Sequence, residues 1–327
     1  MIDLFNETLS TEKRIRSYIR ETPLESSPNF DGLQNTNVFF KCENLQYTGS
    51  FKVRGALSKG FAIQNKDLLK GVVTASTGNH GAATAFALSK IGYKGTIFVP
   101  ENASKVKISN IERHGGIIKF HGSDSGETEF FARNYAKKNN LIYLPPYNDP
   151  QVIGGQGTIA IELKNQLKKI DAVFVSIGGG GLISGIALYL KHISPETKII
   201  GCSPRNSQVM IQSVKNGKLK NYPSKPTISD GTAGGVELDS ITFPIVKNYV
   251  DELLTVSESQ IFSAIKKFMN YHPMTIEGSA GVSIAGYLSK YREWLGKNVV
   301  IVLCGANISL ENLKKVLNSK TKNGSKD

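Results

Sequence analysis

Short runs of β-branched and aromatic residues alternate with longer helical stretches between residues 71 and 146. The runs predict four strands, VVTA, GTIFVP, GIIKFHG and LIYLPP. The stretches between them predict three helices, AATAFALSKIG, KVKISNIERHG and FFARNYAKKN. Strands that are each followed by a helix are typical of a parallel sheet covered by helices. This segment therefore predicts a compact α/β unit that ends at the turn-rich PPYNDP.

A second series of the same kind follows this turn. It predicts helices through TIAIELKNQLKK and LISGIALYLKH, and strands through DAVFVSI, KIIGCS and NVVIVLC. Another run of strand type, NVFFKCENL, precedes the first series. The order predicts an α/β fold with two open, twisted, mostly parallel sheets flanked by helices. We expect a small, mobile domain at 69–148, inserted into a larger domain formed by 1–68 and 149–327, with ligands bound between them.

Composition and charge change this picture little. The 327 residues carry 40 Lys and Arg against 27 Asp and Glu, a formal net charge of +13. The lysines are spread over most polar segments, apart from a dense run after residue 313, so nucleic-acid binding is not expected. No apolar run approaches the ~20 residues of a membrane span, and the start of the chain lacks the pattern of a secretion signal. We expect a cytoplasmic protein without membrane association.

Four consecutive glycines follow the predicted strand DAVFV, in SIGGGGLISG at 176–185. Such a run lets the backbone approach an anion closely, and the next helix adds its positive N-terminal end. The segment therefore predicts a phosphate site rather than only a tight turn. A dinucleotide-binding loop is disfavoured because Ser184 stands where the third glycine would be, and a Walker A loop lacks its Gly-Lys-Ser or Gly-Lys-Thr. A ligand with a single phosphate fits better.

Three further segments carry candidate chemistry. ASTGNHG at 75–81 joins a predicted strand to a helix and suits a carboxylate, although Ser, Thr and Asn are also common helix caps. SFKVRGA at 50–56 is expected to form a loop, in which Lys52 is either a surface cation or an anchored amine. CGAN at 304–307 ends the last predicted strand, where Cys304 is either a buried thiol or a ligand-binding group.

Together these segments resemble the serine/threonine dehydratase and serine racemase family, a group of fold-type II pyridoxal-phosphate enzymes related to the β-subunit of tryptophan synthase. The resemblance runs over nearly the whole chain. It rests on blocks in the same order: SFKVRGA, STGNHG, PYNDP with GQGTIA, SIGGGGLISG, DG at 230–231, EGSAG at 277–281 and CGAN. It implies the fold-type II arrangement of sheets, pyridoxal 5'-phosphate as the cofactor, an amino acid as the substrate and a homodimer.

The resemblance also implies roles for individual residues. Lys52 would be the Schiff-base lysine and catalytic base, with Phe51 beside the cofactor ring. The other cofactor-binding residues would be Asn79 at the ring hydroxyl, Gly178, Gly179, Gly180 and Gly181 at the phosphate, and Cys304 at the ring nitrogen. The substrate carboxylate would be bound by Ser76, Thr77, Gly78, Asn79 and His80, without proton transfer by His80. Because a thiol is a weak hydrogen-bonding partner, the ring nitrogen is expected to stay unprotonated.

The activity implied by the resemblance is β-elimination on a hydroxy amino acid such as L-threonine or L-serine, which gives a 2-oxo acid and ammonia. One alternative is a dehydratase for a less usual hydroxy amino acid, as in the hydroxyectoine pathway, because the STGNHG motif also resembles that of such enzymes. Another is a serine racemase, although Thr77 stands where racemases carry a serine as a second base. A non-catalytic ligand-binding protein on this fold is an alternative of another class.

No metal site is expected. The racemases bind a divalent cation through a segment that reads CSPRNSQVM here, and Ser203 and Val209 stand at the positions of carboxylate ligands. Cys42, Cys202 and Cys304 show no paired spacing for zinc or for a disulfide framework. The arginine of the racemase loop is also absent from GSDSGETEF.

Overall fold

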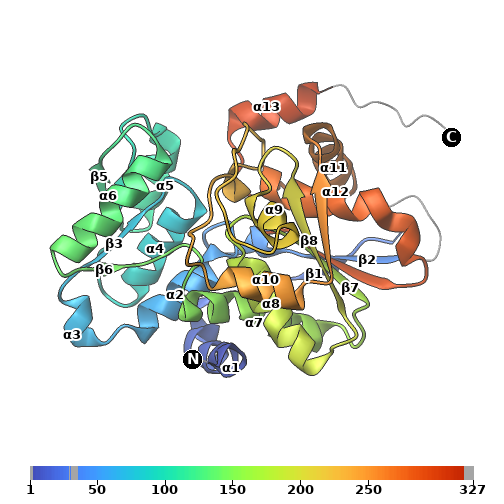
Figure 1. Ribbon diagram of the computed structural model, residues 1–327, viewed down its shortest axis with the longest axis horizontal. Helices are drawn as coiled ribbons and strands as arrows, with labels where there is room; N and C mark the ends of the chain where they lie inside the picture. The colour runs from blue at the N-terminus through green and yellow to red at the C-terminus, as the bar shows by residue number, and fades with distance from the viewer. Residues whose placement is uncertain (1–2, 29, 31–35, 320–327) are drawn as a thin grey trace.

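The computed structural model describes residues 3–28, 30 and 36–319 and contains two sheets (Figure 1). The strands of the large sheet are β1 (Leu24–Ser26), β2 (Asn37–Lys41), β7 (Ala172–Ser176), β8 (Lys198–Pro204), β9 (Glu252–Val256) and β10 (Asn298–Val302). The strands of the small sheet are β3 (Val72–Ala75), β4 (Thr96–Val99), β5 (Ile117–Phe120) and β6 (Ile142–Tyr143). The strand orders are β1-β2-β10-β7-β8-β9 and β5-β4-β3-β6.

The named strands pair in parallel except for β1 with β2. Val300 of β10 lies between Phe39 of β2 and Val173 of β7, which fixes the register at the centre of the large sheet. Each residue of β7 is buried, as expected for a parallel strand with helices over both faces. The prediction of an α/β fold with two mostly parallel sheets is confirmed.

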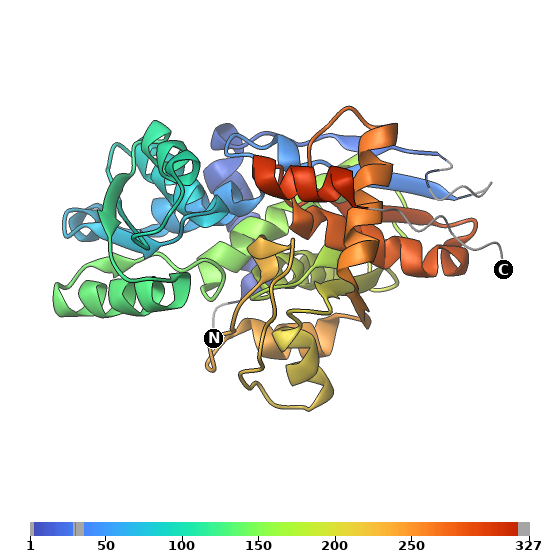
Figure 2. The ribbon, with the colours of Figure 1, turned by 90° about the horizontal axis from the view of Figure 1, so that it is seen from above.

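Helices cover both faces of the small sheet. They are α4 (Asn79–Lys90), α5 (Lys105–Arg113) and α6 (Ser125–Lys138). Phe98 packs toward Ala132 of α6, whereas the neighbouring Ile97 and Val99 pack toward Ile111 of α5, because successive strand residues point to opposite faces. Figure 2 shows this sheet and its helices gathered at one end of the molecule. All four strands lie within the segment 69–148; its status as a separate, mobile domain stays a prediction.

Two layers of helices enclose the large sheet (Figure 1). One layer contains α1 (Leu4–Ile15), α7 (Pro150–Gln166), α8 (Gly181–Ile193) and α10 (Thr242–Tyr249), and the other contains α11 (Glu258–Tyr271), α12 (Gly278–Lys290) and α13 (Leu310–Asn318). The short α9 (Val209–Lys215) packs against α10. Helix α8 begins directly after the glycines that follow β7, so its N-terminus faces the site described below.

Helix α2 (Lys52–Ala62) lies between the small sheet and the large sheet, where it packs against both α4 and α7. The short α3 (Asn65–Leu68) follows it. The expected loop at SFKVRGA is therefore wrong from Lys52 onward, because Lys52 is the first residue of α2. Gly55 allows the close approach to α7, since a Cβ there would lie 2.3 Å from Gln156 Nε2. Gly155 of α7 faces it, and a Cβ on Gly155 would lie 2.6 Å from the Cα of Gly55.

A buried ion cluster holds the first turn of α2. Arg54 has no exposed surface and contacts Glu43 at 2.7 Å and Glu162 at 2.7 Å. Lys41 is equally buried and contacts Glu162 at 2.6 Å. Burial alone would raise the pKa of Glu162, but Arg54 and Lys41 lower it well below the usual range. Glu162 therefore stays charged, and it depends on its cationic partners.

Replacing Arg54 by leucine should destabilise the protein by about 3–5 kcal/mol, because Glu43 and Glu162 would keep their burial and lose their main counterion. Chemical denaturation followed by circular dichroism measures the change. The control is Lys315→Leu, which removes the exposed ion pair with Glu311 and should move the transition far less. Equal shifts in the two variants would contradict a structural role of the buried cluster.

Candidate active site

The amine of Lys52 lies in an interior position with few partners. Its Nζ donates a hydrogen bond to the carbonyl of Pro146 at 2.9 Å and lies 5.3 Å from the ring centroid of Phe51. Although the residue is half-buried as a whole, burial of the amine lowers the pKa of Lys52 to about 8, against the opposing effect of the Glu277 carboxylate. At pH 7 about a tenth of this amine is therefore neutral and nucleophilic, far more than for an ordinary lysine.

Asn79 and Cys304 meet at one carboxylate. Asn79 Nδ2 donates to Glu277 Oε2 at 2.8 Å, and Cys304 Sγ lies 3.5 Å from Glu277 Oε1. Burial raises the pKa of Glu277 to about 7, while the hydrogen bond from Asn79 opposes the rise. Burial and the carboxylate also raise the pKa of Cys304, so its thiol stays protonated. Asn307 completes the chain by donating to Asn79 Oδ1 at 2.7 Å.

The four glycines form the turn between β7 and α8. Gly180 has φ +87°, in the left-handed region that favours glycine, and Gly181 is the first residue of α8. The ring of Tyr147 covers the turn so closely that a Cβ on Gly179 would lie 2.5 Å from it. Thr242 Oγ1 fixes the turn from the other side by donating to the Gly179 carbonyl at 2.6 Å. The backbone N–H groups at this helix N-terminus suit a phosphate.

The segment 76–80 forms the turn between β3 and α4. The N–H of Gly78 donates to Ser76 Oγ at 3.1 Å, and Gly78 is the N-cap of α4. His80 is buried, and its Nε2 lies 3.1 Å from Thr74 Oγ1 and 3.0 Å from the Leu144 carbonyl. Burial lowers the pKa of His80 to about 3, so the imidazole is neutral and holds the turn on the small sheet. A carboxylate at this turn would meet backbone N–H groups and hydroxyls rather than the imidazole.

The structure brings all four predicted segments together. The N–H of Phe51 donates to the Cys304 carbonyl at 3.1 Å, and Ser50 forms a bridge with Gly305. Pro146, which binds the Lys52 amine, directly precedes the tyrosine that covers the glycine turn. The assigned roles of these residues stay predictions.

Sequence reasoning missed two components of this site. Glu277 joins Asn79 to Cys304, and its only signal was the EGSAG block, in which it precedes the first glycine of α12. Pro146 and Tyr147 lie in the PYNDP block, which was assigned only as the end of the first series and as part of the family resemblance.

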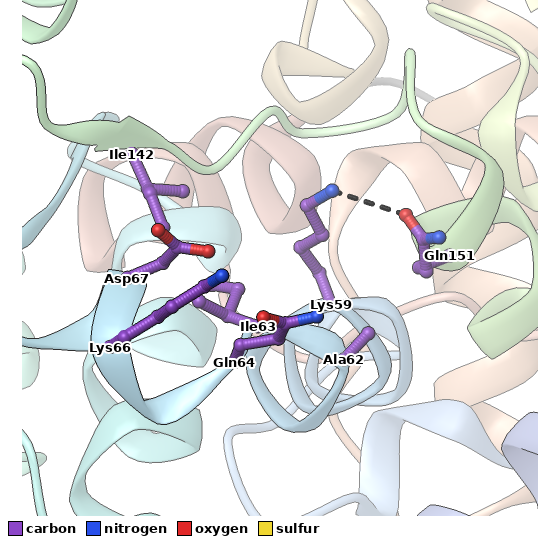
Figure 3. Close-up of a pocket in the computed structure, with 8 residues that line it drawn as sticks. All are labelled: Lys59, Ala62, Ile63, Gln64, Lys66, Asp67, Ile142 and Gln151. Atoms are coloured by element: carbon purple, nitrogen blue, oxygen red, sulfur yellow. Dashed lines mark hydrogen bonds between the residues drawn. The ribbon is translucent and has the colours of Figure 1, made fainter.

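A pocket of about 540 Å³ lies at the far end of α2, away from this site (Figure 3). Lys59 points across it and donates to Gln151 Oε1 at 3.1 Å. Lys66 and Asp67 line another side. Lys59 is seven residues beyond Lys52, about 10 Å along the helix, so the pocket is not part of the four-segment site.

The family model described as pyridoxal-phosphate dependent enzyme matches residues 15–305, and the chain belongs to this family. A serine racemase of Arabidopsis thaliana is 37% identical over 92% of this chain and 92% of its own length. A beta-hydroxyaspartate dehydratase of Paracoccus denitrificans is 36% identical over 95% of this chain and 98% of its own length. The structure of a processed threonine deaminase isoform 2 from Solanum lycopersicum is 33% identical, with a TM-score of 0.91 over 96% of this chain and 92% of that one.

The prediction of pyridoxal phosphate as the cofactor is confirmed by the family, and the residues fit this group. The amine of Lys52 can bind its aldehyde, and the glycine turn can hold its phosphate. Ser184, in the first turn of α8, has a buried hydroxyl without a hydrogen-bond partner among the described residues, as suits a site for a polar ligand. The Asn79 amide and the Cys304 thiol are hydrogen-bonding groups for its ring substituents.

Within residues 3–28, 30 and 36–319, no helix is long and apolar enough to cross a membrane. The same residues contain no group of three or more His, Cys, Asp or Glu side chains arranged to hold a metal ion.

Gly180→Ala should reduce cofactor retention. The new Cβ would lie 3.0 Å from Thr242 and would force a strained backbone at φ +87°. The control is Gly217→Ala, where φ is +70° but no atom lies within 4 Å of the new Cβ. The molar ratio of cofactor to chain after gel filtration should fall only in Gly180→Ala. Equal ratios in the two variants would contradict a role of this turn in holding the phosphate.

Glu277→Gln should lower the pKa of Lys52 below its value of about 8, because the carboxylate is the strongest influence that favours the ammonium form. The pKa is measured from the pH dependence of acylation of Lys52 in protein freed of cofactor, by mass spectrometry of the modified peptide. Glu252→Gln on β9 is the control and should leave the pKa unchanged. An unchanged or higher pKa in Glu277→Gln would show that the two groups are not coupled.

Proposed function

We propose that the protein is a pyridoxal-phosphate-dependent ammonia-lyase that acts on a small hydroxy amino acid such as L-threonine or L-serine. The reaction removes the Cα proton and the β-hydroxyl, and hydrolysis of the resulting enamine gives a 2-oxo acid and ammonia. The observation that carries this proposal is the Lys52 amine, with its pKa of about 8, at the meeting point of a glycine turn and a carboxylate-binding turn.

The bound cofactor supplies an electron sink for the negative charge that develops at Cα. Lys52 Nζ is the group that accepts the Cα proton in its neutral form. The hydroxyls of Ser76 and Thr77 and the N–H groups at the start of α4 hold the substrate carboxylate. The Cys304 thiol and the Glu277 carboxylate form a hydrogen-bonded pair at the end of the site where the resemblance implies the ring nitrogen.

The relatives support elimination as the reaction and racemisation as an alternative. A threonine deaminase and a beta-hydroxyaspartate dehydratase are similar over nearly the whole chain, as expected for a lyase. A similarity of the same extent to a serine racemase favours racemisation as the second candidate. The homodimer and the cytoplasmic location stay predictions.

Lys52→Ala should abolish the visible absorbance band of the lysine-bound cofactor and lower the formation of 2-oxo acid from L-threonine and L-serine by about 10³-fold or more. The control is Lys59→Ala on the same helix, which removes an ion pair with Asp149 and should keep the band. Chiral analysis of the remaining serine measures racemisation in the same samples. A wild-type protein with the band but without 2-oxo acid formation would overturn the lyase proposal.

A further inference from the structure

A charged cluster connects the two sheets beside the site. Arg133 of α6 contacts Glu129, one turn earlier on the same helix, at 2.8 Å. It also contacts Glu237, in the segment that precedes α10, at 2.9 Å. All three side chains are partly buried, with exposed fractions of 33%, 36% and 23% for Arg133, Glu129 and Glu237. Two carboxylates thus share one guanidinium, which leaves the cluster with a formal charge of −1.

The segment that carries Glu237 runs from the site to this cluster. At its start, a Cβ on Gly231 would lie 3.6 Å from Glu277 Oε1. Thr232 lies against the glycine turn, where a Cβ on Gly178 would be 2.9 Å from its Cα. At its end, the N–H of Glu237 donates to the hydroxyl of Tyr147 at 2.8 Å. One continuous segment therefore lines the site and ends at Arg133.

On the side of the small sheet, the cluster lies next to the carboxylate-binding turn. The guanidinium of Arg133 stacks over the ring of Tyr143, 4.3 Å from its centroid. The hydroxyl of Tyr143 lies 3.4 Å from Glu129 Oε1, and the next residue, Leu144, accepts the hydrogen bond of His80. The charge of Glu129 acts at the site, because Glu129 is among the groups that raise the pKa of Lys52, after Glu277 and Cys304.

These contacts restrict the side chain of the substrate. With its carboxylate at the turn at 76–80 and its amine at Lys52, as proposed above, we place its side chain toward α6 and the segment 231–237, which line the site. Arg133 of α6 is paired with two carboxylates, and Lys107 of the neighbouring α5 is paired with Asp230 at 3.7 Å. A second substrate carboxylate would therefore meet the net negative charge of the Arg133 cluster, whose one cation is already paired with two carboxylates.

We propose that Glu129, Arg133 and Glu237 determine the substrate specificity of the site, and select amino acids with an uncharged side chain against those with a carboxylate. This inference rests on the proposed function. It narrows the substrate class to hydroxy amino acids of the serine and threonine type and disfavours 3-hydroxyaspartate. Glu237 is the decisive residue, because its removal would leave Arg133 with only one carboxylate.

The test compares binding of L-asparagine and L-aspartate to the holoenzyme by titration calorimetry, since these ligands have nearly the same shape and differ in charge. The wild type should bind L-asparagine more tightly. Glu237→Gln should shift the preference toward L-aspartate by on the order of tenfold, the size expected for one partly screened charge. The double variant Glu237→Gln/Arg133→Met should lose this gain. Glu252→Gln, which removes a remote carboxylate that is paired with Lys290, should behave as wild type.

The same variants are then assayed for 2-oxo acid formation from L-threonine and L-threo-3-hydroxyaspartate. The ratio of kcat/KM for the two substrates should favour L-threonine in the wild type and move toward 3-hydroxyaspartate in Glu237→Gln. A wild type that prefers L-aspartate, or a preference unchanged by Glu237→Gln, would overturn the inference. Absence of 2-oxo acid from every substrate, together with the expected binding preference, would instead overturn the proposed lyase activity alone.

Discussion

The first turn of α2 is the constraint on which the site depends. It carries Lys52 toward Pro146 and, two residues later, Arg54 toward Glu43 and Glu162. Buried charges tolerate little displacement, because a charge that leaves its partner becomes uncompensated in a medium of low polarity. The ion cluster therefore holds the turn from inside the protein. The amine of Lys52 can keep its position with a single carbonyl partner, and it stays free to react.

Burial has opposite effects on the two central ionisable groups. It lowers the pKa of Lys52 to about 8 and raises the pKa of Glu277 to about 7, since in each case the charged form is the less well solvated one. Both groups therefore exist near neutral pH as mixtures of charged and neutral forms. Such groups can take up and release protons at little free-energy expense, which is a common property of acid-base sites.

The strands of the two series and the glycine turn could be predicted from local patterns, because buried parallel strands read as continuous apolar runs. The helix that begins at Lys52 could not be predicted in this way, because Gly55 weakens its helical pattern. The reason for a glycine at this position is its close contact with Gly155, which only the structure shows. The elements between residues 205 and 251, and β9 with the helices after it, were also not predicted. Glu277 and Glu237 were missed as site residues because their partners lie far away in the sequence, so no spacing rule reveals them.

The turn at 76–80 belongs to the small sheet, whereas the glycine turn and Cys304 belong to the large one. Under the proposed roles, the turn that binds the substrate carboxylate and the groups that bind the cofactor phosphate and ring nitrogen are thus encoded in different segments of the gene. Under the same proposal, mutations in α6 or in the segment 231–237 would alter the range of accepted amino acids while the glycine turn and Cys304 are inherited unchanged. This modularity offers a physical reason why relatives with similar backbones carry names that refer to different substrates.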